Sequence, residues 1–173
     1  TKILDFGAGN LYLAGALLDF LPKVEIFGID VIEDQNLDKQ VMNHSRFQFS
    51  TYNGKNIPAE DNQFDYVIAS AVMHHTPSPE YFLVEIKRVL KPGGALILVE
   101  EMYHNMADKI YISAEDLILN KLKKGVPVPL NFRSYDHYKK EFEKLHYEIE
   151  FEGFVRPSFP FKHHYVFKLV KMK

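Results

Sequence analysis

The chain has 173 residues, a mass of 20.1 kDa and 46% hydrophobic residues, which is the size and composition of one globular domain. Its formal net charge is −2, so the chain lacks the excess of basic residues that drives nonspecific nucleic-acid binding. The absence of cysteine excludes disulfides, thiolate metal sites and cysteine nucleophiles. No apolar run is long enough to cross a bilayer, so we expect a cytoplasmic protein without a membrane span.

The first hundred residues alternate between strand and helix patterns. Residues 2–6 form a short apolar strand pattern, a glycine turn follows at 7–10, and leucines at helical spacing predict a helix over 11–21. Four further strands are expected at residues 24–29, 47–50, 64–70 and 95–99, and two further helices at 36–43 and 79–90. A turn at 91–94 separates the last helix from the last strand. Strands that alternate with helices predict a parallel sheet.

The last third of the chain has a different pattern. Residues 113–116, Ser-Ala-Glu-Asp, resemble a capping box and predict a helix to about residue 124, before an irregular stretch at 126–133. Ser134 can cap another helix that ends near residue 147. Alternating patterns at 148–152 and 165–170 predict a final antiparallel strand pair. We therefore expect an α/β, Rossmann-like, doubly wound and mostly parallel seven-stranded sheet, with an antiparallel C-terminal strand pair and helices on both faces.

Two glycines and one acid stand where such a fold binds ligands. Gly7 and Gly9 follow the first strand, and Asp30 ends the second. Glycine lets a ligand approach the backbone, and Asp30 is placed to accept hydrogen bonds from two ribose hydroxyls. These features fit an adenosine cofactor, with a purely structural turn as the alternative. Tyr12 occupies the position of the last glycine in the dinucleotide pattern, which weakens the case for NAD against S-adenosylmethionine.

Several motifs in order resemble one family. Residues 3–9, Ile-Leu-Asp-Phe-Gly-Ala-Gly, resemble the first motif of class I S-adenosylmethionine-dependent methyltransferases. Residues 28–30, 64–68 and 88–94 are similar to that family's second-strand acid, fourth strand and turn before the fifth strand. The resemblance covers about residues 3–100. Residues 57–58 and the histidine pair at 74–75 point to the subgroup that resembles ubiquinone and menaquinone biosynthesis methyltransferases.

The resemblance implies S-adenosyl-L-methionine as the cofactor, with the first-strand acid and the glycine turn at its methionine part, Asp30 at its ribose and the residues after the third strand at its adenine. The cofactor-binding residues that it implies are Asp5, Gly7, Ala8, Gly9, Asp30, Val31, Tyr52, Asn53 and Ser70. Ser70 would border the methyl-transfer cavity. Leu11 replaces a further glycine of the family motif and is expected to narrow the pocket, and Asn53 stands where an aspartate is frequent.

Methyl transfer from a sulfonium is an in-line displacement, so alignment in a water-poor cavity matters more than a catalytic base. His74 and His75 follow the fourth strand and are the candidate general bases, with packing as the alternative. Tyr103, His104 and Arg133 are the candidate substrate contacts, and an exposed helix-entry charge is the alternative for Arg133. The pair His163–His164 is neither spaced nor accompanied like a metal site, and we expect no metal in this domain.

The resemblance thus implies a single methyltransferase domain over residues 1–173 that methylates a small organic molecule. Residues 102–133 are expected to form a substrate-side insertion or lid, and an N-terminal cover is expected to be missing because the chain enters a strand directly after Thr1. The alternatives are a noncatalytic cofactor-binding or scaffold protein of the same fold, a protein or RNA methyltransferase, and an NAD oxidoreductase. Mild acidity gives no strong nucleic-acid signal.

Overall fold

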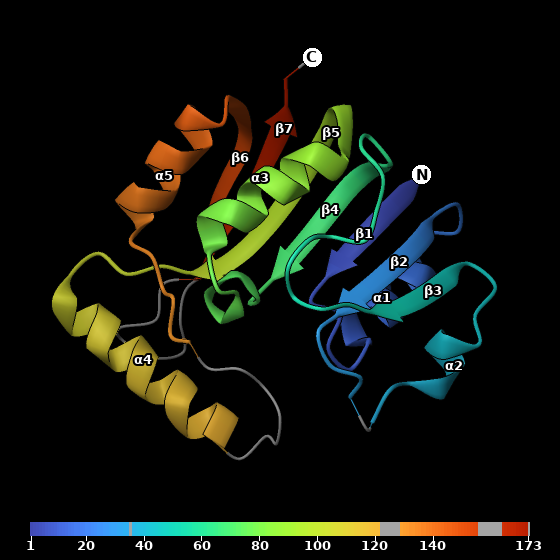
Figure 1. The fold of residues 1–173 in the computed structure, drawn as a ribbon, viewed down its shortest axis with the longest axis horizontal. Coiled ribbons are helices and arrows are strands. Elements are labelled where there is room, and N and C mark those ends of the chain that lie inside the picture. Colours follow the sequence, from blue (N-terminus) through green and yellow to red (C-terminus); the bar gives the residue numbers. More distant parts are fainter. Residues whose placement is uncertain (35, 122–128, 156–163, 173) are drawn as a thin grey trace.

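The computed structural model describes residues 1–34, 36–121, 129–155 and 164–172, and Figure 1 shows how its elements are arranged. One sheet of seven strands has the order β3-β2-β1-β4-β5-β7-β6. The strands are β1 (Lys2–Phe6), β2 (Glu25–Asp30), β3 (Phe47–Thr51), β4 (Phe64–Ser70), β5 (Leu90–Glu101), β6 (Tyr147–Val155) and β7 (His164–Lys171). The first five are parallel, and β7 runs antiparallel to both β5 and β6. The predicted fold class is confirmed.

Helices pack on both faces of the sheet (Figure 1). They are α1 (Tyr12–Phe20), α2 (Lys39–Met42), α3 (Pro79–Val89), α4 (Met106–Lys121) and α5 (Tyr135–Lys144), and a short 3-10 turn η1 spans Met73–His75. One buried cluster joins α1 to β1 and β2, and a larger one joins α3 and α5 to the central strands. The apolar strand patterns reflect this two-sided burial. Among the described residues, no helix is long and apolar enough to cross a membrane.

The strand order places a topological switch point at β1. This strand pairs with β2 on one side and with β4 on the other, so the chain winds in opposite directions from it. The carboxyl ends of β1, β2 and β4 therefore meet at one edge of the sheet. In doubly wound folds that edge carries the ligand site. We call it the carboxyl edge.

Helix α4 begins seven residues before the predicted capping box, and residues 113–116 lie inside it. Asn105 caps the helix instead, because its Oδ1 accepts a 3.0 Å hydrogen bond from the Asp108 amide. The Asp108 carboxylate in turn accepts a 3.1 Å bond from the His104 amide. This reciprocal pair satisfies amides at the start of the helix. The predicted end near residue 124 lies outside the described residues.

The predicted turn at residues 91–94 lies within β5 rather than before it. Leu90 pairs with Phe64 and Ala95 with Tyr66, so the four residues between Leu90 and Ala95 loop out of a continuous strand. The last of them is a glycine whose added Cβ would lie 2.9 Å from a backbone carbonyl oxygen of β4. The loop can therefore pack against β4 only without a side chain at that position.

Candidate cofactor site and acceptor side

The glycine turn after β1 has one closed and one open position. Gly7 and Gly9 both have positive φ angles, of 79° and 51°, which favour glycine. A Cβ at Gly7 would collide with the side chain of Val72, whereas a Cβ at Gly9 would meet no atom of the described chain within 4 Å. The Gly7 amide donates a 2.9 Å hydrogen bond to the Ile29 carbonyl, which ties the turn to β2. The turn thus offers a ligand open backbone at Gly9.

Two apolar residues of this turn point into the core. Ala8 is 6% and Leu11 0% exposed, and both pack in the cluster that contains Ala14 and Leu18 of α1. Leu11 has a left-handed backbone, with φ 70° and ψ 13°, which costs a leucine about 1–2 kcal/mol. Because its side chain fills the core, the prediction that Leu11 narrows the cofactor pocket is wrong.

Asp30 at the end of β2 holds the glycine turn in place through hydrogen bonds to backbone amides. Its Oδ2 accepts a 2.9 Å hydrogen bond from the Gly9 amide, and its Oδ1 accepts bonds of 2.7 and 3.3 Å from the amides of Val31 and Ile32. The side chain is only half-buried. The carboxylate therefore lies directly beside the open position of the turn, with lone pairs still available to a ligand.

Asp5 is a buried acid without a complete set of partners. It lies in β1 and is 2% exposed, and its Oδ2 has no hydrogen-bond partner in the part of the chain that the structure describes. Burial, with a smaller contribution from the negative charge of Asp30, raises the pKa of Asp5 to about 7. A buried polar atom without a partner costs free energy unless a ligand satisfies it. A cationic ligand group at this edge, such as an ammonium, would do so.

The residues after β3 border the same place. The Tyr52 amide donates a 3.0 Å hydrogen bond to the Asp30 carbonyl, and Val31 is 40% exposed beside it. Burial, followed by the charge of Asp30, raises the pKa of Tyr52, so its phenol stays protonated. Asn53 is exposed, and its Oδ1 accepts a 3.0 Å bond from the Lys55 amide. The predicted adenine-side residues are thus brought together next to Asp30.

The loop after β4 leads from this site to a second group of residues. Ser70 ends β4 and is exposed, and Ala71 follows with a positive φ of 50°. This bend turns the chain into η1. There the Met73 amide donates a 2.9 Å hydrogen bond to Glu100 Oε2 at the end of β5. We call the region around η1, the end of β5 and α4 the acceptor side.

His74 is fixed at one edge and one face of its ring. Its Nδ1 lies 2.5 Å from Glu100 Oε1, and Phe132 stacks on it with a centroid distance of 4.4 Å and an interplanar angle of 13°. Burial disfavours the charged imidazolium, but Glu100 outweighs it and the pKa of His74 is raised. His75 and His74 each point a ring nitrogen at Asp116 Oδ1 of α4, at 3.9 and 3.8 Å. The two predicted base candidates are thus brought together.

Tyr103 and His104 lie just after β5. The Tyr103 amide donates to the Arg133 carbonyl, and the Lys109 ammonium lies 5.3 Å from the centre of the Tyr103 ring. His104 Nε2 lies 2.7 Å from the hydroxyl of Tyr165 in β7. The structure therefore places both residues at the entry to α4, and their predicted contact with a substrate stays a prediction.

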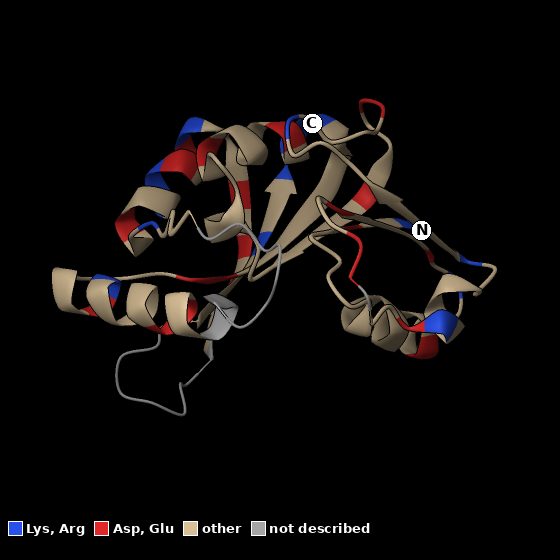
Figure 2. Cartoon of the chain, turned by 60° about the horizontal axis from the view of Figure 1, so that its bottom comes forward, with Lys and Arg blue, Asp and Glu red and all other residues tan. Residues whose placement is uncertain are grey.

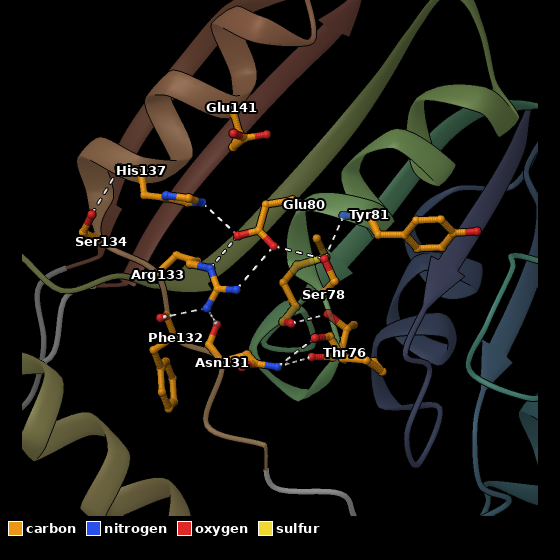
Figure 3. Close-up of polar contacts among 12 residues, drawn as sticks. Thr76, Ser78, Glu80, Tyr81, Asn131, Phe132, Arg133, Ser134, His137 and Glu141 are labelled. Atoms are coloured by element: carbon orange, nitrogen blue, oxygen red, sulfur yellow. Dashed lines mark hydrogen bonds and ion pairs between the residues drawn. The ribbon is translucent and has the colours of Figure 1, made fainter.

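Arg133 binds Glu80 at the start of α3, as Figure 3 shows. Its Nε and Nη2 lie 2.5 and 3.3 Å from the two carboxylate oxygens, and His137 Nε2 adds a 2.8 Å contact. Partial burial raises the pKa of Glu80, but the hydrogen bonds from Arg133 outweigh it and lower the pKa to about 2. This network fastens the segment before α5 to α3. The predicted substrate role of Arg133 stays a prediction.

Sequence reasoning missed Glu100 and Asp116. The signal available in the sequence was an acid placed directly after the apolar run at residues 95–99. Glu100 is in fact 1% exposed, and a buried acid needs a specific partner. Asp116 gave no such signal, since the helix that carries it was expected to start only at residue 113. Its approach to the histidines depends on how α4 packs.

A switch-point glycine turn, an acid at the end of the second strand and a buried acid with one oxygen unpaired among the described residues define a Rossmann-like cofactor-binding domain. Residues 4–98 match the family described as "Methyltransferase domain", and the chain belongs to this family. It is a class I S-adenosylmethionine-dependent methyltransferase domain, as the resemblance implied. The prediction of S-adenosyl-L-methionine as the cofactor is confirmed.

Curated relatives differ in what they act on. A tRNA U34 carboxymethyltransferase of Nautilia profundicola is 33% identical over 99 residues, which are 56% of this chain and 33% of that protein. A demethylmenaquinone methyltransferase of Staphylococcus carnosus is 32% identical over 103 residues, covering 58% of this chain and 43% of that protein. The chain thus spans less than half the length of these two relatives.

Solved structures share the fold over almost the whole chain. A SAM-dependent methyltransferase of Methanosarcina mazei superimposes with a TM-score of 0.73 at 19% identity, over 99% of this chain and 92% of that one. One from Aquifex aeolicus gives a TM-score of 0.69 at 19% identity, over 99% and 82%. At this identity the likeness establishes the fold.

Proposed function

We propose that the protein transfers the methyl group of S-adenosylmethionine to a small organic molecule by in-line displacement. The observation that carries the proposal is the buried Asp5 carboxyl, whose Oδ2 finds no partner in the described chain, beside the open turn at Gly9. The cofactor supplies an ammonium for such a carboxyl and a ribose for Asp30. Family membership in the methyltransferase domain supports the same reading.

In this proposal the cofactor lies along the carboxyl edge from β1 to β3. Asp5 receives the ammonium, and Gly7, Ala8 and Gly9 form the turn under the methionine part. The ribose hydroxyls donate to Asp30, which already lies 2.9 Å from the Gly9 amide and so fixes the turn before the ligand arrives. The adenine lies against Val31, Tyr52 and Asn53. Ser70 then borders the sulfonium, from which the methyl points toward η1.

His74 and His75 are proposed to activate the acceptor. His74 is 4% exposed, and with Nδ1 directed at Glu100 its Nε2 is left to face Asp116 and the acceptor side. A neutral imidazole in that orientation can take a proton from a hydroxyl or amine as the methyl is transferred. A general-base role for one of the two histidines stays a prediction.

The acidity of the acceptor side favours a small molecule over a nucleic acid. Figure 2 shows acidic positions on α4 and on the end of β5 that leads into it. By sequence, α4 carries three acids and two lysines, and β5 ends in two glutamates. Phosphates are repelled by such carboxylates and bind basic surfaces instead. RNA is the second candidate acceptor, because one of the relatives is a tRNA U34 carboxymethyltransferase.

We propose that residues 1–173 form one domain and that residues 102–121 and 129–133 cover the acceptor; residues 122–128 of the predicted lid lie outside the described residues. Helix α4 projects from the carboxyl edge in Figure 1 and brings Asp116 to the histidines. Tyr103, His104 and Arg133 flank this segment. Hydrogen exchange should be fast along α4 without ligands and slow once cofactor and acceptor are bound, while β1 and β5 stay protected throughout. Equal protection of α4 and β5 without ligands would show that the segment is no lid.

The test of the function is transfer of label from methyl-labelled S-adenosylmethionine. The purified chain is incubated with the donor and, separately, with a fractionated extract of small metabolites, total tRNA and a protein mixture. Label in a metabolite fraction is the expected result, and it should vanish with Asp30→Ala. Label in tRNA would instead show that RNA, the second candidate, is the acceptor. Cofactor binding without label in any arm would favour a noncatalytic scaffold.

A further inference from the structure

Three potential metal ligands from two separate elements converge on the acceptor side. His74 and His75 in η1 direct their Nε2 atoms at Asp116 Oδ1 in α4, at 3.8 and 3.9 Å. All three atoms lie within 4.8 Å of one another. Ligands bonded to one zinc ion at 2.0–2.2 Å lie roughly 3–3.5 Å apart, so the two contacts to Asp116 need to shorten by about 0.5 Å and the two imidazole nitrogens by at most about 1.5 Å. Rotation of the partly exposed His75 and Asp116 side chains provides such a movement.

The most buried of these ligands is already oriented. Glu100 holds Nδ1 of His74, which directs the Nε2 lone pair toward Asp116. Glu100 is itself fixed, because the amides of Met73 and Glu101 donate to its two oxygens at 2.9 and 3.1 Å. A carboxylate that accepts from one imidazole nitrogen while the other binds an ion is the usual outer shell of a protein metal site. This contact would be costly to build for packing alone, since it buries a charge.

The charge and access of the cluster also suit a cation. Two carboxylates, of Glu100 and Asp116, face two imidazoles, with side-chain exposures of 1% and 11% for the acids. A divalent ion would balance them in a buried place. The His75 side chain is 21% exposed, so the cluster is open to solvent at that ligand.

We infer that His74, His75 and Asp116 bind a divalent transition-metal ion of the zinc class, with Glu100 as the outer partner of His74. Two imidazoles and one carboxylate suit Zn²⁺ or Fe²⁺ rather than Mg²⁺, which prefers oxygen ligands. Three protein ligands leave at least one coordination position for water or an acceptor oxygen. The inference goes beyond the proposed function and replaces the expectation of a metal-free site.

Such an ion would change how these histidines serve methyl transfer. A hydroxyl bound to a divalent ion loses its proton far more easily than a free one. The acceptor hydroxyl would lose its proton to solvent water at the open His75 end of the cluster, and its oxygen would take the methyl as the methyl–sulfur bond breaks and S-adenosylhomocysteine leaves. The two imidazoles would then act as ligands instead of bases. An imidazole nitrogen that binds the ion cannot also accept a proton, so a metal titration distinguishes the role of ligand from the role of general base.

The experiment uses the whole chain without a histidine tag, stripped with a chelator and titrated with Zn²⁺ by calorimetry. Co²⁺ is added in parallel, because its visible absorption reports the ligand geometry. His75→Gln and Asp116→Asn each remove one ligand at the more accessible end of the cluster. His146→Asn is the matched control, since His146 is exposed at the end of α5 with a positive φ of 51° that asparagine tolerates. Thermal unfolding checks that each variant is folded.

The expected result is one Zn²⁺ per chain in the wild type and in His146→Asn, with at least tenfold weaker binding in each ligand variant. Mg²⁺ should not compete. The inference is overturned if the wild type does not take up one equivalent, or if both folded ligand variants bind as tightly as the control. If Asp116→Asn unfolds, His75→Gln alone decides. No cofactor is present in the titration, so its outcome is independent of whether the chain transfers methyl groups.

Discussion

The cofactor side and the acceptor side of this molecule are built in different ways. The cofactor side comes from residues between 5 and 53 together with Ser70, and much of it is backbone, held by the turn at Gly7 and Gly9 and by Asp30. The acceptor side joins side chains from η1, β5 and α4, of which His74, Glu100 and Asp116 are far apart in sequence. The first is a local consequence of strand–turn–helix structure, and the second depends on tertiary packing.

The two sides also differ in how their charges are balanced. On the cofactor side Asp5 is buried with an oxygen that has no partner in the described chain, so a cation from outside can complete it. On the acceptor side Glu100 is paired with His74 within the protein, and on the neighbouring helix α3 Glu80 is paired with Arg133. Changes on the cofactor side should therefore affect ligand binding most, and changes in the Glu80 network should affect stability most.

The largest expected effect is at the open glycine of the turn. Gly9→Val should abolish measurable binding of S-adenosylhomocysteine in calorimetry, because branched atoms would fill the space now open beside Asp30. The variant should remain folded, at a strain cost of about 1–2 kcal/mol. Gly93→Val is the matched control, since Gly93 also has a positive φ and open space around it. Retained binding in Gly9→Val would mean that the turn serves only the fold.

Leu11→Ala should mainly reduce stability. Truncation of a fully buried leucine costs about 2–5 kcal/mol, measured as the free energy of unfolding in urea. At a temperature where the variant is folded, its affinity for S-adenosylhomocysteine should change less than about threefold. Altered affinity at unchanged stability would instead place this side chain in the cofactor pocket.

Glu80→Gln tests the tether between α3 and the segment before α5. Loss of the charge-assisted bonds to Arg133 and His137 should lower the unfolding free energy by about 2 kcal/mol at pH 7. The folded-state pKa of Glu80, about 2, is below its ordinary 4.5. Its contribution is therefore present above pH 4.5 and lost as the pH falls toward 2, so wild type and variant should converge in acid. Glu143→Gln, an exposed acid on α5, should show neither effect.

Asp5 predicts a pH dependence of cofactor binding. Its pKa of about 7 means that below this pH the free protein carries a proton that an incoming ammonium must displace. The affinity for S-adenosylhomocysteine should be constant above pH 7 and fall by up to tenfold for each unit below it. Calorimetry between pH 5.5 and 8.5 measures this slope. Asp5→Asn should bind more weakly at pH 8 and lose the slope, and an unchanged slope would assign the titration to another group.

The contrast between the cofactor side and the acceptor side also explains which features could be predicted from the sequence. The strand positions, the glycine turn and Asp30 follow from short apolar runs and local turn chemistry, which are visible within a few residues. The helix after Ser134 was placed correctly at its start by the same means, because Ser134 Oγ accepts from the His137 amide.

The remaining features depend on three-dimensional contacts. The start of α4 was missed because Asn105 and Asp108 cap it, while a second capping pattern inside the helix was equally good by sequence. The orientation of Leu11 was missed because a left-handed leucine is stable only where core burial compensates for the strain. The pairing of Arg133 with Glu80 joins residues 53 positions apart, and nothing local indicates it.

The most direct test of the cofactor site is a calorimetric titration of wild type and Asp30→Ala with S-adenosylhomocysteine and with NAD. The wild type should bind S-adenosylhomocysteine and give no heat with NAD. Asp30→Ala should weaken binding by roughly ten- to hundredfold, because two hydrogen bonds to a carboxylate are lost. Asp34→Ala, the next acid but one along the chain, is the matched control and should bind like the wild type. Binding of NAD, or equal affinity for S-adenosylhomocysteine in all three proteins, would contradict a methyl-donor site at Asp30.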